Sequence, residues 1–509
     1  MKSLISHKAL FTGILLLGVV ALVSCKKEEP PFEPYVPVIP APCDTCRNVS
    51  AGTPVSLENI QDTYAGVAFG APSAWGPYNV HDPVILQEGE YYYCYNTDVA
   101  YGRAVEFGKT AGHQIRRSKD LVEWEYRGTV FTEYPPLGKK YIEDGGGTPF
   151  ENLWAPCIYK HNNEFRLYYS LSSAVPRLSC IGLATAPHPE GPWTEKGLVV
   201  TSVPEGNMTN AIDPSVIVAQ DGKHWMYYGS SWDGIYLLEL DPATGLAKNT
   251  GSRGIRVAHR GRTGNTPNGN IEGAEIIYNE QFGMYYLFIA YDWLATKYNT
   301  RVVRSTSPQG PFYDYEGNIA NTHDDNGPMI VAPYAFMGHE GWQGVSHPGV
   351  FKNSGGDFFI AHQGRPAVSP AYMVLHVRKL HWTEDGWPVA SPERYAAVPQ
   401  SPIPASELAG DWERIVFGYE VVPGFANEQT DSDLQIAAPL KIHADGTLGT
   451  DPANTWTYSA PWLTLNWSNG RTEKVHVSRE RDWEKRVTST LVFSGFDDQG
   501  TTIWGKKVN

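Results

Sequence analysis

The sequence predicts an all-β protein, with a five-bladed β-propeller followed by a small C-terminal antiparallel β barrel or sandwich. Apolar strands of alternating β-branched and aromatic residues, bounded by Gly, Asn and Asp, recur throughout residues 60–400. A unit of about four such strands repeats five times there, and no segment has a convincing helical period. From residue 405 the strands lengthen and are joined by Asp-Gly and other Gly-containing turns, which predicts a separate β domain over 405–509.

The chain begins with the features of a secretion signal. Residues 1–24 have a basic start and an apolar run, and Leu22-Val23-Ser24-Cys25 follows. This ending resembles a bacterial lipobox, which implies cleavage before Cys25 and lipidation of that cysteine. A plain signal peptide with an incidental cysteine is the alternative. The "KKEE" that follows resembles the acidic export tags of Bacteroidetes surface lipoproteins, so we expect an outer-membrane, cell-surface location.

Residues 25–59 are predicted to be a linker, because they are rich in Pro and lack apolar periodicity. Within them Cys43 and Cys46 form one CxxC motif, either a small disulfide or half of a metal site, and no second CxxC exists to complete a zinc site. The other cysteines lie in apolar strands and are expected to be buried thiols; they are Cys94, Cys157 and Cys180.

The repeat itself is the strongest functional signal. Each unit opens with a short motif, such as "HDP" or "IDP", directly before an apolar strand. We align the residues that head the five units as Asp82, Ala155, Asp213, Glu272 and His347, which are 58 to 75 residues apart. In a propeller the innermost strands run along the central axis, so these side chains converge on one funnel.

Three acids and a histidine at five aligned positions favour a functional site. Asp-Pro and Glu-Gly are also common turn residues, and this alternative explains any one of them taken singly. It explains the set poorly. Several like charges near one axis are unfavourable, so we expect that they are kept for catalysis or ligand binding. With no Ser-His pair and no phosphate loop, the set suggests general acid–base hydrolysis of a glycosidic bond.

In their order and spacing, "HDP", "NLWAP", "AIDPSV", "IEGAEIIY" and "GVSHPGVF" resemble glycoside hydrolase family 43 over residues 60–400. With the added tail, the chain resembles the two-domain extracellular endo-arabinanases of that family. The resemblance implies inverting cleavage of internal α-1,5-L-arabinofuranosyl bonds in arabinan, a neutral plant cell-wall polysaccharide. Asp82 would be the general base, Glu272 the general acid, and Asp213 the residue that tunes and orients the acid. His347 would hold a calcium ion, largely through shared waters.

Two positions need comment beside this resemblance. Family members often have Asp after "WAP", where this chain has Cys157. A second acid, Glu275, follows Glu272 by three residues, so in a regular strand it should face the other way.

Aromatic residues near the motifs could form a platform for sugar rings, although each could equally belong to the core. Trp154 is the strongest candidate because it directly precedes Ala155. Trp232 and Trp293 fall where strands run into loops, and Trp75 precedes the first unit.

Charge excludes one class of partner. The formal net charge is −14, whereas phosphate binding needs clustered Lys and Arg, so we expect no nucleic acid. The lipid anchor would be the only link to a membrane, and we expect a monomer. The alternatives to an endo-arabinanase are an exo-acting α-L-arabinofuranosidase or β-xylosidase, and a non-catalytic glycan-binding propeller.

Overall fold

The computed structural model describes residues 54–60, 67, 70–99, 112–205, 208–425 and 429–508, all within one compact unit, Pro40–Asn509. The predictions of a signal peptide, a lipidated Cys25, and a disulfide or metal half-site at Cys43 and Cys46 lie outside these residues. No helix among the described residues is long and apolar enough to cross a membrane.

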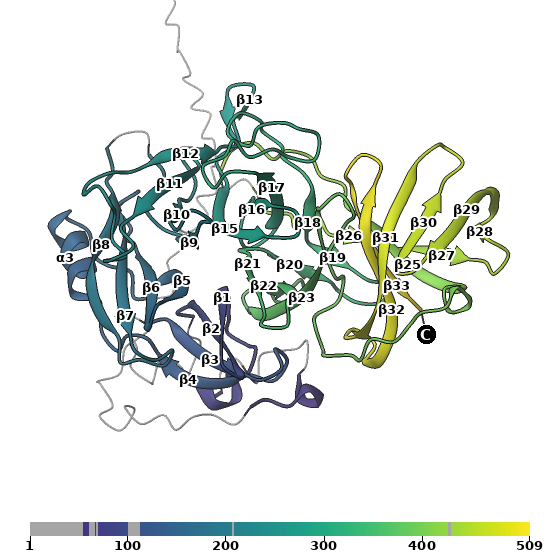
Figure 1. Ribbon diagram of the computed structural model, residues 1–509, viewed down its shortest axis with the longest axis horizontal. Helices are drawn as coiled ribbons and strands as arrows, with labels where there is room; N and C mark the ends of the chain where they lie inside the picture. The colour runs from purple at the N-terminus through teal and green to yellow at the C-terminus, as the bar shows by residue number, and fades with distance from the viewer. Residues whose placement is uncertain are drawn as a thin grey trace, which may run out of the picture. The chain divides into compact units, whose positions relative to one another are not determined.

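The described part of the chain is all-β and propeller-like. Four sheets of four antiparallel strands follow one another in sequence, and Figure 1 shows β1, β5, β9, β15 and β21 innermost around a common centre. The sheets comprise β1 (His81–Glu88), β2 (Tyr91–Thr97), β3 (Gln114–Ser118) and β4 (Glu125–Thr129); β5 (Trp154–His161), β6 (Glu164–Leu171), β7 (Ser179–Ala186) and β8 (Thr194–Ser202); β9 (Ser215–Val218), β10 (His224–Tyr228), β11 (Ile235–Leu240) and β12 (Ile255–Ala258); and β15 (Ile271–Asn279), β16 (Met284–Tyr291), β17 (Asn299–Ser305) and β18 (Met329–Val331).

The predicted fifth blade does not occur as a separate four-stranded sheet. Its strands belong to a seven-stranded sheet whose members are β24 (Pro388–Ala390), β23 (Val374–Trp382), β22 (Phe358–Pro366), β21 (Gly349–Lys352), β20 (Trp342–Gln343), β19 (Tyr334–Ala335) and β26 (Gln435–Ile436). β26 comes from the C-terminal region and pairs in parallel with β19. A short hairpin, β13 (Arg262–Thr263) with β14 (Thr266–Pro267), precedes β15.

Apolar side chains join each sheet to the next. Val84 and Tyr95 of the first sheet share a core with Ile158 and Leu167 of the second. Similar cores join the second sheet to the third and the third to the fourth. The seven-stranded sheet packs on the fourth sheet and also on the first, where Phe359 meets the core around Ile85. The buried state of the thiols of Cys94, Cys157 and Cys180 is confirmed.

The C-terminal region is a closed barrel, which decides between the predicted barrel and sandwich. Its interior is filled by apolar side chains such as Trp412, Leu463 and Phe493. The barrel strands are β25 (Gly410–Val416), β27 (Ala438–Ile442), β28 (Thr447–Leu448), β29 (Asp451–Ser459), β30 (Trp462–Asn466), β31 (Thr472–Asp482), β32 (Val487–Asp497) and β33 (Thr502–Lys507).

Helical structure is sparse in the described residues. One α-helix, α3 (Pro136–Asp144), lies between the first two sheets, where the sequence pattern indicated none. A Pro in the first turn suits the start of a helix. The helix is short and Ile142 is its one fully buried apolar side chain, so the sequence shows no clear apolar period there. Short 3₁₀ turns are η2 (Leu57–Asn59), η3 (Pro72–Ala74) and η4 (Ala405–Glu407).

Candidate active site

The residues that head the inner strands share an unusual backbone. The φ angles of Asp82, Asp213 and His347 are 52°, 59° and 58°, and that of Ala155 is 29°. Left-handed backbone is uncommon for residues other than Gly, with Asp and His among the better-tolerated types. In the fourth sheet the residue with this geometry is Gly273, at φ 58°.

The strand register corrects our alignment by one residue in the fourth sheet. Glu272 pairs with Ala290 just as His81 pairs with Thr97 and Trp154 pairs with Ser170. Glu272 therefore occupies the position before the left-handed residue, and Gly273 is the true counterpart of Asp82. The acid still faces the centre, because Gly273 supplies the left-handed turn that Asp or His supplies elsewhere.

Asp82 is held in its ionised form. Its side chain accepts a hydrogen bond of 2.5 Å from the hydroxyl of Thr97 and lies 2.7 Å from His81 Nδ1 and 3.1 Å from His347 Nδ1. Burial alone would raise the pKa of Asp82, but the two imidazoles and the Thr97 hydroxyl hold it well below its ordinary value. Its backbone N–H is fixed by Gln363 Oε1 at 3.0 Å.

Glu272 is held by two hydroxyl groups. Ser230 Oγ donates to Oε2 at 2.7 Å and Tyr298 OH donates to Oε1 at 2.8 Å. The Tyr298 oxygen also lies 3.3 Å from His347 Nδ1. Tyr298 and His347 therefore form a continuous polar path from Glu272 to Asp82.

Asp213 completes the group. Its Oδ2 accepts from the N–H of Gly273 at 3.2 Å, and its own N–H donates to Ser170 Oγ at 3.1 Å. Burial and the nearby carboxylates of Glu272 and Asp82 raise the pKa of Asp213 well above its ordinary value. The three predicted acids thus meet at one site, with Asp82 ionised and Asp213 favoured in its protonated form.

Glu275 faces the same side of the sheet as Glu272, so our expectation for it is wrong. The register shifts between these residues, and Glu275 pairs with Phe288, two residues from the partner of Glu272. The bulge at Gly273 adds one residue to the strand and so restores the facing. Burial raises the pKa of Glu275 to about 8, although the Ser215 hydroxyl and the Val350 N–H lower it.

Cys157 lies close to Glu275. Burial, together with the charge of Glu275, raises the pKa of the Cys157 thiol. The register places Cys157 and Glu275 at matching positions, because each follows a left-handed residue by two positions. The carboxyl group of Glu275 therefore occupies, on the fourth sheet, the position that Cys157 occupies on the second.

Three of the predicted tryptophans, Trp154, Trp232 and Trp293, are partly exposed, and we call them the rim. Trp154 stacks on Phe150, with centroids 5.1 Å apart. The side chain of Trp232 is 44% exposed, and Trp293 is half-buried. Trp75 does not join them, because it is 2% exposed and packs edge-on against Tyr126. Its ring belongs to the core.

A segment of the C-terminal region reaches this rim. The connection between β25 and β26, described at residues 417–425 and 429–434, is tied to the propeller-like part by backbone hydrogen bonds from Gly269 N to Gly424 O and from Gly424 N to Pro267 O, at 2.8 Å and 2.7 Å. Phe425 lies against Trp232, with centroids 5.4 Å apart. Gln429 Oε1 accepts from the N–H of Trp293 at 2.5 Å.

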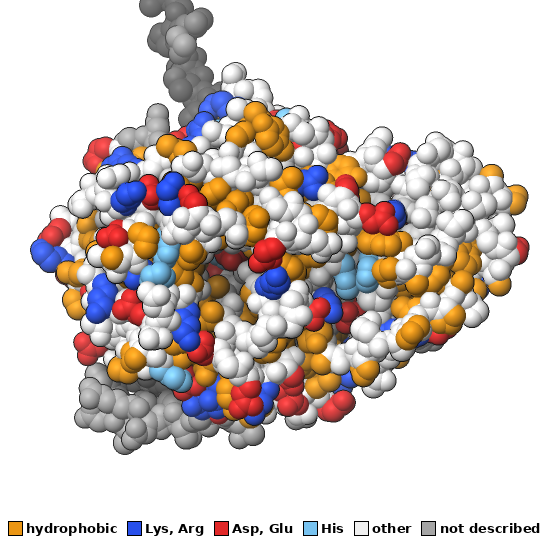
Figure 2. Space-filling view, in the orientation of Figure 1, with side chains coloured by type: hydrophobic (Ala, Val, Ile, Leu, Met, Phe, Trp, Pro, Cys, Tyr) orange, Lys and Arg blue, Asp and Glu red, His pale blue; other side chains and the backbone are white. Residues whose placement is uncertain are grey.

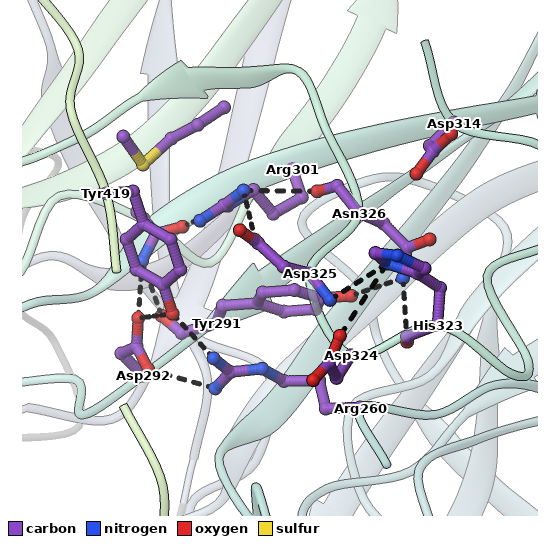
Figure 3. A network of polar contacts seen from close by, with 12 residues as sticks. Arg260, Tyr291, Asp292, Arg301, Asp314, His323, Asp324, Asp325, Asn326 and Tyr419 are labelled. Atoms are coloured by element: carbon purple, nitrogen blue, oxygen red, sulfur yellow. Dashed lines mark hydrogen bonds and ion pairs between the residues drawn. The ribbon is translucent and has the colours of Figure 1, made fainter. Parts of the chain in front are cut away.

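A buried polar network anchors the same connection, as Figure 3 shows. Arg260 Nη1 lies 2.9 Å from Asp292 Oδ1, and both side chains are fully buried. Tyr419 OH donates to Asp292 Oδ2 at 2.7 Å, and the guanidinium of Arg301 stacks 3.9 Å from the centre of the Tyr419 ring. A buried ion pair with further hydrogen bonds is costly to break, so the connection is held firmly.

Sequence reasoning missed the neutral groups that position the acids. Thr97 ends β2, Ser230 follows β10 and Tyr298 precedes β17. They belong to none of the head motifs, so only their positions in the fold reveal them. His81 stands in the "HDP" motif and could have been recognised there.

His347 offers one ring nitrogen to the predicted calcium ion. His347 directs Nδ1 toward Asp82, so only its Nε2 could bind a metal. In the described part of the chain, the one cluster of three His, Cys, Asp or Glu donors is Glu393, Asp482 and Glu484, away from this site and already bound by Lys506. Ca²⁺ takes six to eight oxygen ligands, so these side chains alone do not form a calcium cage.

Comparison with known proteins agrees with the geometry. Residues 74–388 match the model of glycosyl hydrolases family 43, and residues 392–505 match a C-terminal lipocalin-like domain of that family. The extracellular endo-α-(1→5)-L-arabinanase of Thermotoga petrophila is 28% identical over 84% of this chain and 93% of its own. An extracellular exo-α-(1→5)-L-arabinofuranosidase of Cellvibrio japonicus is 30% identical over 61% of this chain and 86% of its own.

A solved structure extends the likeness to both parts of the fold. The crystal structure of endo-1,5-α-L-arabinanase from Thermotoga petrophila has a TM-score of 0.71 and 26% identity, covering 85% of this chain and 99% of that one. The family match spans most of the propeller-like part and includes the three acids of the site. The chain belongs to family 43 of the glycosyl hydrolases and is a glycosidase.

Proposed function

We propose that the protein is an inverting endo-acting hydrolase of α-1,5-L-arabinan. The observation that supports this best is the convergence of Asp82, Glu272 and Asp213, with Asp82 ionised and the two oxygens of Glu272 held by hydroxyl donors. The likeness to an endo-arabinanase over both parts of the chain supports the substrate and the internal mode of attack.

In this proposal Asp82 takes a proton from the attacking water. Glu272 gives its proton to the leaving glycosidic oxygen as the bond to the sugar breaks, and the water attacks from the opposite face. Asp213 orients Glu272 through the N–H of Gly273. Ser230 and Tyr298, which donate to its two oxygens, hold the carboxyl group of Glu272 in place. Inversion follows because one displacement reverses the anomeric centre.

We also propose that β21–β24 are the fifth blade and that the propeller spans residues 60–400, with the barrel domain over 405–509. The packing of the seven-stranded sheet on both the fourth and the first sheet supports this. Trp154, Trp232 and Trp293 would line the sugar-binding rim.

A calcium ion held by His347 stays a proposal in which water supplies most ligands. Such an ion would supply positive charge beside the acids. Chelation followed by calcium addition tests it: loss and recovery of activity with Ca²⁺ would support an ion, and full activity after chelation would contradict it.

The location that we propose for the protein rests on residues 1–25. Lipidation at Cys25 after removal of residues 1–24 would place a monomeric enzyme on the outer membrane, with residues 25–59 as a spacer. Mass spectrometry of the membrane-bound protein tests this, because an unmodified N-terminus would exclude the anchor.

The decisive experiment is digestion of linear arabinan, with the anomer of the first product identified by NMR. We expect short oligomers of inverted configuration, and no product from Glu272→Gln. Retention of configuration would contradict the roles of Asp82 and Glu272.

An exo-acting arabinofuranosidase is the second candidate, favoured by the 30% identical Cellvibrio relative. Release of a single short product from the first minutes of digestion, without a fall in polymer length, would identify this mode.

A further inference from the structure

A cavity of about 650 Å³ lies between the seven-stranded sheet and the barrel. Its walls are the β21–β22 turn, the end of β23 and the barrel strands β29 to β31. His347 precedes β21, whereas the cavity lies at the other end of that strand, where Lys352 pairs with Phe358. The cavity is therefore separate from the acids. Figure 2 shows histidine and apolar side chains together near the edge of the barrel.

Aromatic rings form much of its wall. Trp462 and Tyr458 come from the barrel, and Trp382 comes from β23. Trp462 lies edge-on to His476, with centroids 5.4 Å apart, and is half-buried. A pocket of this size, with aromatic walls and a few polar groups, is typical of small-molecule sites.

Four buried polar atoms in residues of the wall lack partners within the described part of the protein. His381 Nε2, His476 Nδ1, Trp382 Nε1 and Glu480 Oε2 are buried and make no hydrogen bond among the described residues. Glu480 is only 2% exposed. Buried polar groups are nearly always hydrogen-bonded, so four such atoms in residues of one wall leave unused hydrogen-bonding capacity beside the cavity.

The charges of the wall indicate which ligand fits. Burial lowers the pKa of His381 well below its ordinary value and that of His476 to about 4, and it raises the pKa of Glu480 to about 8. All three are therefore neutral near pH 7. Lys379, the cation of the lining, is paired with Asp357 at 3.0 Å. Stacking rings with neutral donors and acceptors suit a neutral polyhydroxyl ligand better than an ion.

We infer that this cavity, which we call the junction pocket, is a second carbohydrate-binding site for a short stretch of a neutral polysaccharide. The identity of that polysaccharide as arabinan rests on the proposed function. A site remote from the acids would hold the polymer near the enzyme between cuts and raise the local concentration of chain.

The test is calorimetric titration of the full chain carrying Glu272→Gln with arabinohexaose. We expect two sites. Adding Trp462→Ala should weaken one of them at least about tenfold, since truncating a buried aromatic anchor removes much of its binding energy. In the otherwise unchanged enzyme, Trp462→Ala should raise KM for polymeric arabinan and leave turnover of a short chromogenic arabinoside unchanged.

Trp456→Ala is the matched control. Trp456 lies on the same hairpin, is half-buried and donates to His443 O at 2.8 Å, outside the pocket. It should preserve both sites. Glu480→Gln, which keeps the shape and changes one acceptor, replaces Trp462→Ala if that variant does not fold.

One site, insensitive to Trp462→Ala and Glu480→Gln, would overturn the inference. If arabinohexaose fails to bind, xylohexaose and cellohexaose are titrated next. Binding of either that is lost in Trp462→Ala would support the pocket while contradicting arabinan as the substrate, and binding of neither would overturn the pocket too.

Discussion

The polar residues that head the inner strands have a strained backbone. Asp82, Asp213 and His347 all have left-handed φ angles and precede a proline. Such strain costs about 1–3 kcal/mol per residue and is found chiefly where function requires it. Here it turns three polar side chains toward one centre, so the cost lies in residues of the proposed active site.

Thr97 should set the pH range of the base. Thr97→Val removes the hydroxyl that donates to Asp82 and helps to keep its pKa low. Because the base must be ionised, the acid limb of kcat/KM should move to higher pH, with a smaller change at the optimum. Thr97→Ser, which retains the hydroxyl, should restore the original limb, and an unmoved limb in Thr97→Val would contradict this role.

Glu275 should make the fold less stable as pH rises. Its folded pKa of about 8 exceeds its ordinary value of 4.5, so between these values the unfolded chain loses a proton that the folded chain keeps. The free energy of unfolding should fall across this window by on the order of 5 kcal/mol. Glu275→Gln should flatten that part of the curve measured by urea unfolding.

The matched control for this change is Glu340→Gln, at an exposed glutamate. It should leave the slope with pH as it is. An equal slope in Glu275→Gln and the unchanged protein would show that Glu275 is ionised in the folded state.

Among the larger elements, the 417–434 connection matters most for the site. It follows β25 of the barrel in sequence, yet Phe425 contacts Trp232 and Gln429 contacts Trp293. The C-terminal region thus contacts the rim within one compact unit.

Phe425→Ala should weaken the substrate binding that we propose for the rim. Removing the ring takes away one of the two described groups that pack on Trp232, the other being Arg177, so we expect KM for arabinan to rise severalfold with little change in kcat, as for loss of uniform binding. Kinetics on linear arabinan measure this. Tyr313→Ala, at a 42% exposed ring, is the control and should behave as the unchanged enzyme. A fall in kcat alone would place Phe425 in the chemistry instead.

The repeat could be read from sequence because each inner strand follows the same head motif. Local patterns could not reveal the bulge at Gly273, so they placed Glu275 on the wrong face and Glu272 one residue out of register. Tyr298 and Ser230 were beyond prediction, since contacts between distant strands alone bring them to Glu272. Trp75 was wrongly assigned to the sugar-binding residues, because closeness to a motif in the sequence does not distinguish a tryptophan of the core from one of the rim.

For the molecule as a whole, an ion cluster joins the two parts of the fold. Lys506 of β33 contacts Glu393, which follows β24, and also Asp482 and Glu484, at 2.7 to 3.1 Å. These side chains are at most 4% exposed. Removing the cation would leave buried carboxylates with no counter-charge.

Lys506→Met should therefore lower the free energy of unfolding by about 3–5 kcal/mol. Calorimetry should show one transition moved to lower temperature, because both parts share the cluster. Lys474→Met is the control: its exposed pair with Glu384 at 2.7 Å also joins the two parts, and surface pairs contribute at most about 1 kcal/mol. Equal destabilisation by the two changes would contradict the special role of Lys506.

The pairing of β26 with β19 bears on how such enzymes can be recombined. A chimera spliced near residue 390 would inherit a foreign strand inside a native sheet and a foreign ring beside Trp232. The two parent enzymes would have to share the residues that form these contacts. We therefore expect the two parts of the chain to have diversified together and not as interchangeable modules.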